Sequence, residues 1–409
     1  MKTNKIILAT TYAVNPFKGS EDGMGWNFVC QIARFHKVIA VTRKNNRFHI
    51  ERYMQQHPNA LYQNITFLYY DLPYWMRFWK KGSRGAMLYF WMWQYGVVNF
   101  IKKQDIDFDI VHNLNFHNDW TPSYLWKLNK PFVWGPIGHH PAIPKQYLKP
   151  YKSIYMFKDR LSWKIKKLFW TRSNALQNTI KNANHIFCMN SSVQKELNLN
   201  KNKFSIMPSV ATQDFGEGEH TRSKKFTLIS AGRLVPLKGF DLSILAFASF
   251  LKTIPVAHRE NCELIVVGKG PERDFYQHLC QENGILAYVK FIDWIERDAL
   301  MNLFQSSTAF IFPSHEGAGM VVAEALSFGL PVICLENEGP GEFIDSSCGF
   351  AIRKQSYLNT IRDLDSAIHQ LYIKPHLLKE MKQNARKKFQ TSFDWDRRGE
   401  TLNEIYQKL

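Results

Sequence analysis

Two carboxylates lie on either side of a glycine-bearing loop in the C-terminal half of the chain. Glu316 and Glu324 are eight residues apart, with Gly317 and Gly319 between them. Glycines let a ligand approach the backbone closely, and free N–H groups at a helix N-terminus attract anionic or hydroxyl-rich ligands. We predict that the two glutamates hold different parts of one elongated ligand. The alternative is that they only stabilise a helix dipole. The elements expected here are a strand at 309–312, a loop at 314–319, a helix at 320–328 and a strand at 331–335.

Two cations are expected close together earlier in the same half. A predicted strand ends in Gly232-Arg233, and Lys238 follows five residues later, just ahead of a predicted helix at 242–251. Two cations and a helix N-terminus at one point are the parts that bind a diphosphate. An ordinary pair of surface cations is the alternative. The next predicted strand, 262–267, also ends in a glycine loop suited to close approach of a ligand, with Gly268 and Gly270.

The N-terminal half predicts a Rossmann-like domain. A buried strand at 5–11 leads into a loop that contains Gly19, and a helix is expected from about residue 27 to 34. The loop does not fit a dinucleotide fingerprint with its acid about 20 residues further on, which disfavours nicotinamide chemistry. Further strands, separated by helical patterns, predict a parallel sheet covered on both faces. They are expected at 37–42, 65–70, 108–113 and 132–134.

Three histidines follow or end these strands. His112 ends one strand, and His139 and His140 come shortly after another. Ligands of open α/β sheets bind beyond the carboxyl ends of the strands, so all three are candidate binding residues. Each is equally well interpreted as an ordinary loop histidine.

The size and composition predict two globular domains. A chain of 409 residues is too long for one hydrophobic core, and 45 % hydrophobic with 22 % charged residues excludes a disordered chain. The segment 211–225 is polar and without periodicity, as a linker is, and we place the domain boundary near residue 205. The six cysteines lack C-x-x-C or Cys/His metal spacing, so we expect reduced thiols in a cytoplasmic protein.

A net charge of +18 indicates an anionic partner. Two segments, 74–103 and 145–172, are both basic and aromatic, which favours docking on an anionic membrane surface. The alternative is that their aromatic residues belong to the core and their lysines to a solvated face. No run of about 18 apolar residues occurs, so a membrane-spanning segment is not expected.

The residues of the C-terminal half match a known pattern. It comprises Gly232-Arg233, Lys238-Gly239, Ser314-x-Glu316-Gly317-x-Gly319, Glu324-Ala325 and Gly329-x-Pro331. The chain resembles the retaining glycosyltransferases of family 4, particularly bacterial polysaccharide-building members. The resemblance implies the GT-B fold, with two α/β Rossmann-like doubly wound domains facing each other across a cleft. It divides the chain into an acceptor-side domain at 1–205, a nucleotide-sugar domain at 206–388, and a helical segment at 389–409 that crosses back to the first domain.

The resemblance also implies roles for single residues. Arg233 and Lys238 would neutralise the leaving diphosphate, Glu316 would contact the donor sugar, and Glu324 the nucleotide ribose. Gly19 would border the cleft, and the glycines near the donor would be Gly232, Gly268, Gly270, Gly317 and Gly319. His112, His139 and His140 would lie on the acceptor side. Many relatives carry a histidine directly after the strand 132–134, where this chain has Gly135-Pro136.

The implied reaction is transfer of a hexose-type sugar from a nucleoside diphosphate sugar to a hydroxyl of a glycan or lipid-linked acceptor, with retention and without a metal ion or cofactor. Two alternatives are a nucleotide-sugar epimerase of the same fold and a non-catalytic polyanion-binding protein. RNA-binding signatures are absent from the sequence, so a nucleic acid partner is not expected. The expected location is cytoplasmic, at the inner face of the membrane.

Overall fold

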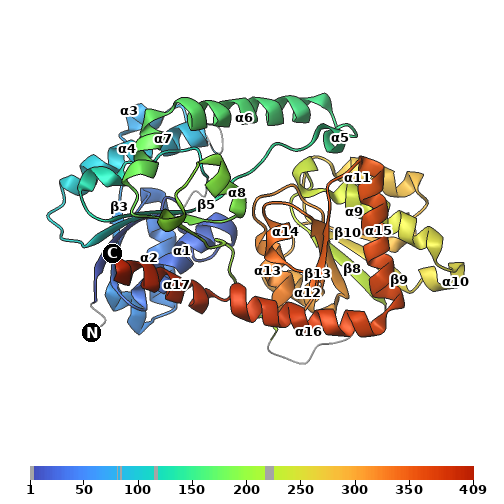
Figure 1. The fold of residues 1–409 in the computed structure, drawn as a ribbon. Helices are drawn as coiled ribbons and strands as arrows, with labels where there is room; N and C mark the ends of the chain where they lie inside the picture. The colour runs from blue at the N-terminus through green and yellow to red at the C-terminus, as the bar shows by residue number, and fades with distance from the viewer. Residues whose placement is uncertain (1–3, 81, 83–84, 115–117, 217–224) are drawn as a thin grey trace. The chain divides into compact units, whose positions relative to one another are not determined.

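A computed structural model describes residues 4–80, 82, 85–114, 118–216 and 225–409. Residues 217–224 of the predicted linker, and three residues of the aromatic segment 74–103, lie outside this range. The chain divides into two compact units, each with its own parallel sheet (Figure 1). Unit 1 comprises 1–139, 164–209 and 395–409, and unit 2 comprises 140–163 and 210–394.

The sheet of unit 1 has seven parallel strands in the order β3-β2-β1-β4-β5-β6-β7. The order reverses between β1 and β4, which is the switch point of a doubly wound sheet. The central strands are apolar throughout because helices cover both faces. The strands are β1 (Ile6–Thr10), β2 (Lys37–Thr42), β3 (Ile65–Tyr69), β4 (Ile110–Asn113), β5 (Phe132–Ile137), β6 (His185–Cys188) and β7 (Phe204–Ile206).

The first helix of unit 1 begins earlier than the sequence pattern predicts. It starts at Ser20 rather than near residue 27, because Glu21 and Asp22 occupy its first turn, where acids offset the helix dipole. The α-helices assigned wholly to this unit are α1 (Ser20–Ala33), α2 (Arg47–Gln56), α3 (Tyr74–Arg77), α4 (Ala86–Lys102), α7 (Asn174–Asn182), α8 (Ser191–Glu196) and α17 (Trp395–Lys408). Short 3-10 helices are η1 (Lys44–Asn46), η2 (Ala60–Asn64), η3 (Leu125–Leu128) and η4 (Lys201–Lys203).

The sheet of unit 2 has six parallel strands in the order β10-β9-β8-β11-β12-β13. Strands β8 and β11 are neighbours although about 80 residues separate them in the chain, and this brings their carboxyl ends together. The strands are β8 (Phe226–Ala231), β9 (Cys262–Val267), β10 (Val289–Ile292), β11 (Ala309–Phe312), β12 (Val332–Leu335) and β13 (Gly349–Ile352).

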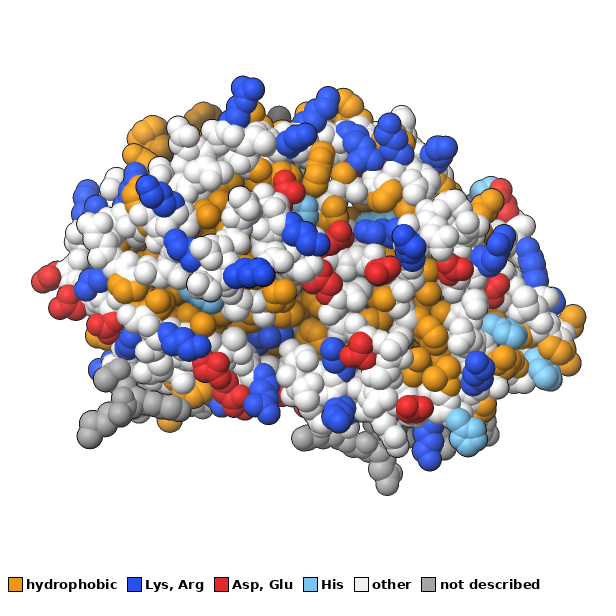
Figure 2. Space-filling model, viewed as in Figure 1, with side chains coloured by type: hydrophobic (Ala, Val, Ile, Leu, Met, Phe, Trp, Pro, Cys, Tyr) orange, Lys and Arg blue, Asp and Glu red, His pale blue; other side chains and the backbone are white. Residues whose placement is uncertain are grey.

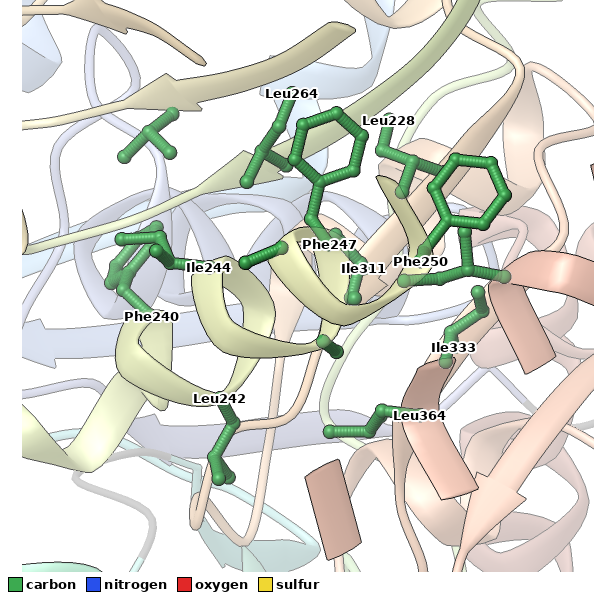
Figure 3. Packing of buried hydrophobic residues seen from close by; sticks show 14 of the residues in the cluster. Leu228, Phe240, Leu242, Ile244, Phe247, Phe250, Leu264, Ile311, Ile333 and Leu364 are labelled. Carbon is green, nitrogen blue, oxygen red and sulfur yellow. The ribbon is translucent and has the colours of Figure 1, made fainter. Parts of the chain in front are cut away.

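Side chains alternate between two hydrophobic cores on the two faces of this sheet. Leu228 packs in one core with Phe240 and Phe247 of α9 (Phe240–Thr253), as Figure 3 shows. The next residue, Ile229, belongs to the other core. Phe240 and Phe247 are fully buried, and each contributes roughly 2 kcal/mol of hydrophobic stabilisation. The remaining helices of unit 2 are α5 (Lys145–Leu148), η5 (Pro236–Lys238), α10 (Val256–Arg259), α11 (Arg273–Glu282), η6 (Leu286–Tyr288), α12 (Arg297–Ser306), α13 (Met320–Ser327), α14 (Pro340–Phe343), α15 (Tyr357–Ile373) and α16 (Pro375–Ser392).

The segment 140–163 belongs to unit 2, whereas the sequence placed it in the first domain. Three tyrosines of the segment hold it there. The Tyr147 hydroxyl donates to the Gln355 carbonyl oxygen at 3.0 Å, and the Tyr155 hydroxyl donates to Glu272 Oε1 at 2.5 Å. Tyr151 lies 3.1 Å from the Tyr276 hydroxyl. The division between the units falls within α6 (Ser153–Arg172).

The C-terminal helix belongs to unit 1. Helix α17 begins at Trp395, not at 389, because α16 continues to Ser392. Its residue Gly399 lies so close to the Gln31 side chain of α1 that a Cβ atom would collide with it. Among the described residues, no helix has the length and apolar character needed to cross a membrane.

Candidate active site

Two glycine loops meet at the carboxyl ends of β8 and β9. Gly232 has a φ of 153° and Gly268 a φ of 145°, and a Cβ atom on Gly268 would collide with the Gly232 carbonyl oxygen. Backbone hydrogen bonds join the loops, including one of 2.9 Å from Leu234 N to the Lys269 carbonyl oxygen. A Cβ atom on Gly270 would meet the Leu234 carbonyl oxygen. These glycines are therefore needed for backbone packing, which leaves a surface without side chains at the strand ends.

A cavity of about 410 Å³ opens beside these loops. The exposed Arg233 lines it on one side, and Trp294, whose exposed fraction is 65 %, lines it on another. Asp293, which directly precedes Trp294, pairs its carboxylate with Arg273. The other lining residues are Ala231, Gly232, Val267, Gly268, Lys269, Ile295, Leu300 and Val321.

Lys238 and Glu316 form an ion pair at the same edge of the sheet. Lys238 Nζ lies 2.7 Å from Glu316 Oε2, and both side chains are largely buried, with exposed fractions of 16 % and 20 %. The lysine stem lies against Gly232, where a Cβ atom would be 3.4 Å from Lys238 Cδ. Gly239, with a φ of 68°, closes the turn after Lys238 against the Pro313 carbonyl oxygen. The structure thus brings the predicted phosphate cation and the predicted sugar carboxylate into direct contact.

The Glu316 loop is held by a residue that the sequence analysis missed. Asn337 is buried; its Nδ2 donates to the Ser314 carbonyl oxygen at 2.7 Å, and its Oδ1 accepts from Gly341 N at 2.9 Å. A Cβ atom on Gly339 would lie 2.5 Å from the Glu316 carbonyl oxygen, so the two loops pack backbone to backbone. An asparagine shortly before Gly-Pro is a turn signal, and it was the only sequence cue to this role.

Glu324 lies one turn inside α13, with an exposed side-chain fraction of only 6 %. Burial raises the pKa of its carboxyl group, and the charge of Arg297 opposes that rise. Arg297 donates to Glu324 Oε1 at 2.7 Å and lies over the ring of Phe215, 5.3 Å from its centroid. Neither Arg297 nor Phe215 carried a functional signal in the sequence. Gly317 and Gly319 lie between the two glutamates, and Gly319 directly precedes α13.

The three candidate histidines have different environments. His140 belongs to unit 2, where its Nδ1 accepts from Gly317 N at 3.1 Å, so it supports the Glu316 loop. His139 belongs to unit 1 and lies 2.7 Å from the buried carboxylate of Asp119. Gly19 also belongs to unit 1, at the N-terminus of α1.

His112 has a structural environment, which argues against the acceptor-side role predicted for it. The side chain is fully buried, its Nδ1 lies 2.5 Å from the Tyr406 hydroxyl, and its Nε2 lies 2.8 Å from the Gly135 carbonyl oxygen. Because Nε2 donates to the carbonyl, Nδ1 accepts from Tyr406, as in a neutral ring. Burial lowers the pKa of His112 to about 3, which keeps the ring neutral. His112 thus links Tyr406 of α17 to the sheet of unit 1.

Comparison with known proteins identifies the part of the chain that carries the paired glutamates. Residues 213–388 match the model of the family described as Glycosyl transferases group 1. We call this matched segment the group 1 domain. The match confirms the resemblance predicted from the motifs, while membership of family 4 and retention stay predictions. The group 1 domain contains Arg233, Lys238, Glu316 and Glu324.

The curated relatives match over less than half of this chain. A D-inositol 3-phosphate glycosyltransferase of Acidothermus cellulolyticus is 30 % identical over 142 residues, which is 31 % of this chain and 32 % of the relative. The lipopolysaccharide glucosyltransferase WaaG of Escherichia coli is 32 % identical over 139 residues, which is 33 % of this chain and 35 % of WaaG. An uncharacterised glycosyltransferase of Methanocaldococcus jannaschii is 25 % identical over 182 residues, 44 % of each chain. The matched regions thus span less than half of these relatives.

Solved structures match over nearly the whole chain. The crystal structure of WaaG, described as involved in lipopolysaccharide biosynthesis, has a TM-score of 0.62 at 19 % identity and covers 98 % of this chain and 99 % of WaaG. HepE from Anabaena in complex with UDP has a TM-score of 0.61 at 14 % identity and covers 99 % and 100 % of the two chains. At these identities the likeness concerns the fold. It confirms the predicted α/β GT-B class with two Rossmann-like domains.

Proposed function

We propose that the chain is a retaining glycosyltransferase that moves a hexose-type sugar from a nucleoside diphosphate sugar to a hydroxyl of a glycan or lipid-linked acceptor, in the synthesis of a cell-surface polysaccharide. The contact between Lys238 and Glu316 carries the proposal, because it joins a cation suited to a diphosphate with a carboxylate suited to sugar hydroxyls. The names of relatives that act in lipopolysaccharide synthesis support the polysaccharide context. Since the matched family is one of transferases, the epimerase and polyanion-binding alternatives are not favoured.

Positive charge on the leaving-group side drives the proposed reaction. Departure of the diphosphate develops negative charge, and cations fixed in place before the reaction lower its barrier most directly. Arg233 and Lys238 supply such cations at the carboxyl end of β8, without a metal ion or other cofactor in the proposed mechanism. Gly232 and Gly268 leave the strand ends without side chains, so the phosphates can approach the backbone closely there.

Donor binding exchanges the partners of Lys238. Without ligand its charge is neutralised by Glu316 at 2.7 Å. A diphosphate carries more negative charge and draws the ammonium group to itself, which frees Glu316 to accept hydrogen bonds from the hexose. Glu324, with Arg297 keeping its carboxylate paired, accepts from the ribose hydroxyls. On the acceptor side in unit 1, His139 with Asp119, and Gly19, are the remaining candidates.

The test is a donor screen followed by product analysis. The full-length protein is incubated with uridine, guanosine and adenosine diphosphates and their sugars, and the melting temperature is recorded, since a ligand of the native state raises it. Uridine sugars head the screen because HepE has been crystallised with UDP-glucose. The stabilising donor is then supplied with glycan and glycolipid acceptors. Product with the donor's anomeric configuration supports the proposal, and conversion of donor without acceptor would instead indicate an epimerase.

The proposed place of action is the cytoplasmic face of an anionic membrane. Helix α6 carries an apolar stripe at spacings of three and four residues, formed by Ile154, Phe157, Leu161, Ile165 and Leu168, with exposed fractions of 44 to 63 %. Figure 2 shows Lys and Arg side chains beside hydrophobic ones along the upper edge of the view, where Figure 1 places α6. An exposed apolar stripe flanked by cations suits the interface of a bilayer with anionic headgroups.

Neutralising three lysines of α6 should weaken membrane binding. The variant K164Q/K166Q/K167Q should bind vesicles that contain one third anionic lipid about 10²-fold more weakly than the wild type in a flotation assay, because each of the three cations near such a surface contributes roughly 1 kcal/mol. The control variant K374Q/K379Q/K387Q lowers the net charge equally at exposed positions of and beside α16. Equal flotation of the two variants would contradict a specific role of α6.

A further inference from the structure

A second exposed apolar surface lies in unit 1, on α3 and the first half of α4. The aromatic segment 74–103 divides between core and surface: Tyr89, Phe90 and Trp93 are buried, as the core interpretation predicts. Other aromatic and apolar side chains of the same segment are exposed to solvent by 38 to 73 %. They are Tyr74, Trp75, Phe78, Leu88, Trp91 and Tyr95. Patches of this kind on soluble proteins mark interaction sites.

An apolar pocket of about 450 Å³ opens in this surface. It begins where the chain leaves β3, because Tyr70, Leu72 and Pro73 follow the last residue of that strand directly. The pocket therefore lies at the carboxyl edge of the sheet, the edge at which α/β domains bind ligands. The remaining lining residues come from α3, α4 and the loop before η3: Met76, Trp91, Met92, Tyr95, Gly96, Asn99 and Tyr124.

The lining suits a flexible hydrocarbon chain. The lining consists of two methionines, several aromatic rings and other side chains, and no carboxylate is among them. Thioether side chains adapt to ligands of irregular shape. Gly96 lets the wall lie close to the Tyr70 hydroxyl and the Leu72 side chain, which a Cβ atom at this position would displace. A volume of this size is within the range of small-molecule sites.

One cation lies over two of the lining rings. Lys127 Nζ is 5.2 Å from the ring centroid of Tyr95 and 5.4 Å from that of Tyr124. An ammonium group in this position pairs with an anionic group at the head of a molecule whose apolar tail enters the pocket. The charge and the apolar lining together specify an anionic amphiphile, since a neutral apolar ligand would make no use of Lys127.

We propose that this pocket binds the hydrocarbon chain of an amphiphilic acceptor, and that Lys127 pairs with the anionic group at its head. This proposal rests on the proposed glycosyltransferase function. It specifies that the acceptor is linked to a lipid and is not a free glycan. The occupant is the tail of one molecule, in contrast to the bilayer surface that faces the α6 stripe.

The test measures binding of alkyl phosphates below their micellar concentration to the full-length protein, by isothermal titration calorimetry. Each buried methylene strengthens binding by about fourfold, so octyl phosphate should bind about 10²-fold more tightly than butyl phosphate. M76D places a carboxylate in the pocket and should abolish this dependence on chain length. F48D is the matched control, because Phe48 of α2 is also an exposed hydrophobic residue of unit 1 and does not line the pocket. K127Q should weaken octyl phosphate about tenfold and leave neutral octyl glucoside unchanged.

Other occupants predict different results, each of which would overturn the proposal. If M76D lowers vesicle flotation while no alkyl phosphate binds the wild type, the surface docks on a bilayer. If M76D abolishes a concentration-dependent dimer in sedimentation velocity, the occupant is a second copy. If the affinity depends equally on alkyl length in M76D and F48D, the hydrocarbon tail binds outside this pocket. Melting temperatures with nucleoside diphosphates are recorded in parallel. Failure to bind any nucleoside diphosphate would overturn the proposed transferase function, whereas failure to bind alkyl phosphates alone would overturn only the pocket proposal.

Discussion

Replacing Lys238 with alanine should lower kcat about 10³-fold, because removal of one preorganised group that stabilises developing charge costs a factor of this order. The loss should appear mainly in kcat rather than KM, since the charge on the diphosphate grows as the glycosidic bond breaks. Steady-state kinetics with the donor identified in the melting screen measure both constants. K238R, which keeps the charge, should retain more activity than the alanine variant.

Two comparisons separate this effect from a general loss of structure. Lys252 is an exposed lysine at the other end of α9, so K252A should have wild-type kinetics. Because the Lys238–Glu316 pair is largely but not fully buried, its loss should lower the unfolding free energy by about 2 kcal/mol, less than the loss of a fully buried pair. Near-normal turnover by K238A with an intact fold would show that the leaving group is stabilised elsewhere.

The sequence predicted those parts of the site that depend on local pattern. Strand β11 has its predicted bounds and α13 begins where predicted, because a short apolar run, a glycine loop and a helical pattern are each encoded within a few residues. The glycines at 232, 239 and 268 have positive φ angles, which marks turns that other residues rarely adopt. The roles assigned to Arg233, Lys238 and the glutamates came from the family resemblance and not from local pattern.

Contacts between distant residues could not be predicted from such patterns. The partner of Glu324 is Arg297, which begins a helix of its own and follows Glu296 like an ordinary surface residue. His112 was correctly expected at the end of a strand, but its burial depends on Tyr406, which is 294 positions away. The segment 140–163 joins unit 2 through tyrosine hydroxyl groups that bond to distant polar atoms. None of these contacts leaves a periodic signal in the chain.

Replacing Arg297 with alanine should lower the unfolding free energy by about 2 kcal/mol at pH 7.5, the second large effect. Removing one partner of a buried ion pair leaves an uncompensated charge, and Glu324 is the buried member. Arg297 is 43 % exposed, so the loss is smaller than for a fully buried pair. Urea denaturation of the full-length protein followed by far-ultraviolet circular dichroism measures it. R273A is the matched control, because the Arg273–Asp293 pair is more exposed.

The pH dependence and a second substitution identify the cause. A carboxyl group whose pKa is raised in the folded state opposes folding above its unfolded pKa, and R297A removes the charge that limits this rise for Glu324. The deficit of R297A should therefore be largest at neutral and alkaline pH and shrink as the pH falls towards 5. R297A/E324Q should recover most of the lost stability, since glutamine has no charge to leave unpaired.

If Glu324 also holds the ribose, E324Q should still raise the dissociation constant for the nucleoside diphosphate about 10²-fold, because a hydrogen bond to a charged group contributes roughly 1.5–3 kcal/mol. Recovered stability together with lost nucleotide affinity in the double variant would assign Glu324 to ligand binding, and retained affinity would reduce the pair to a structural contact.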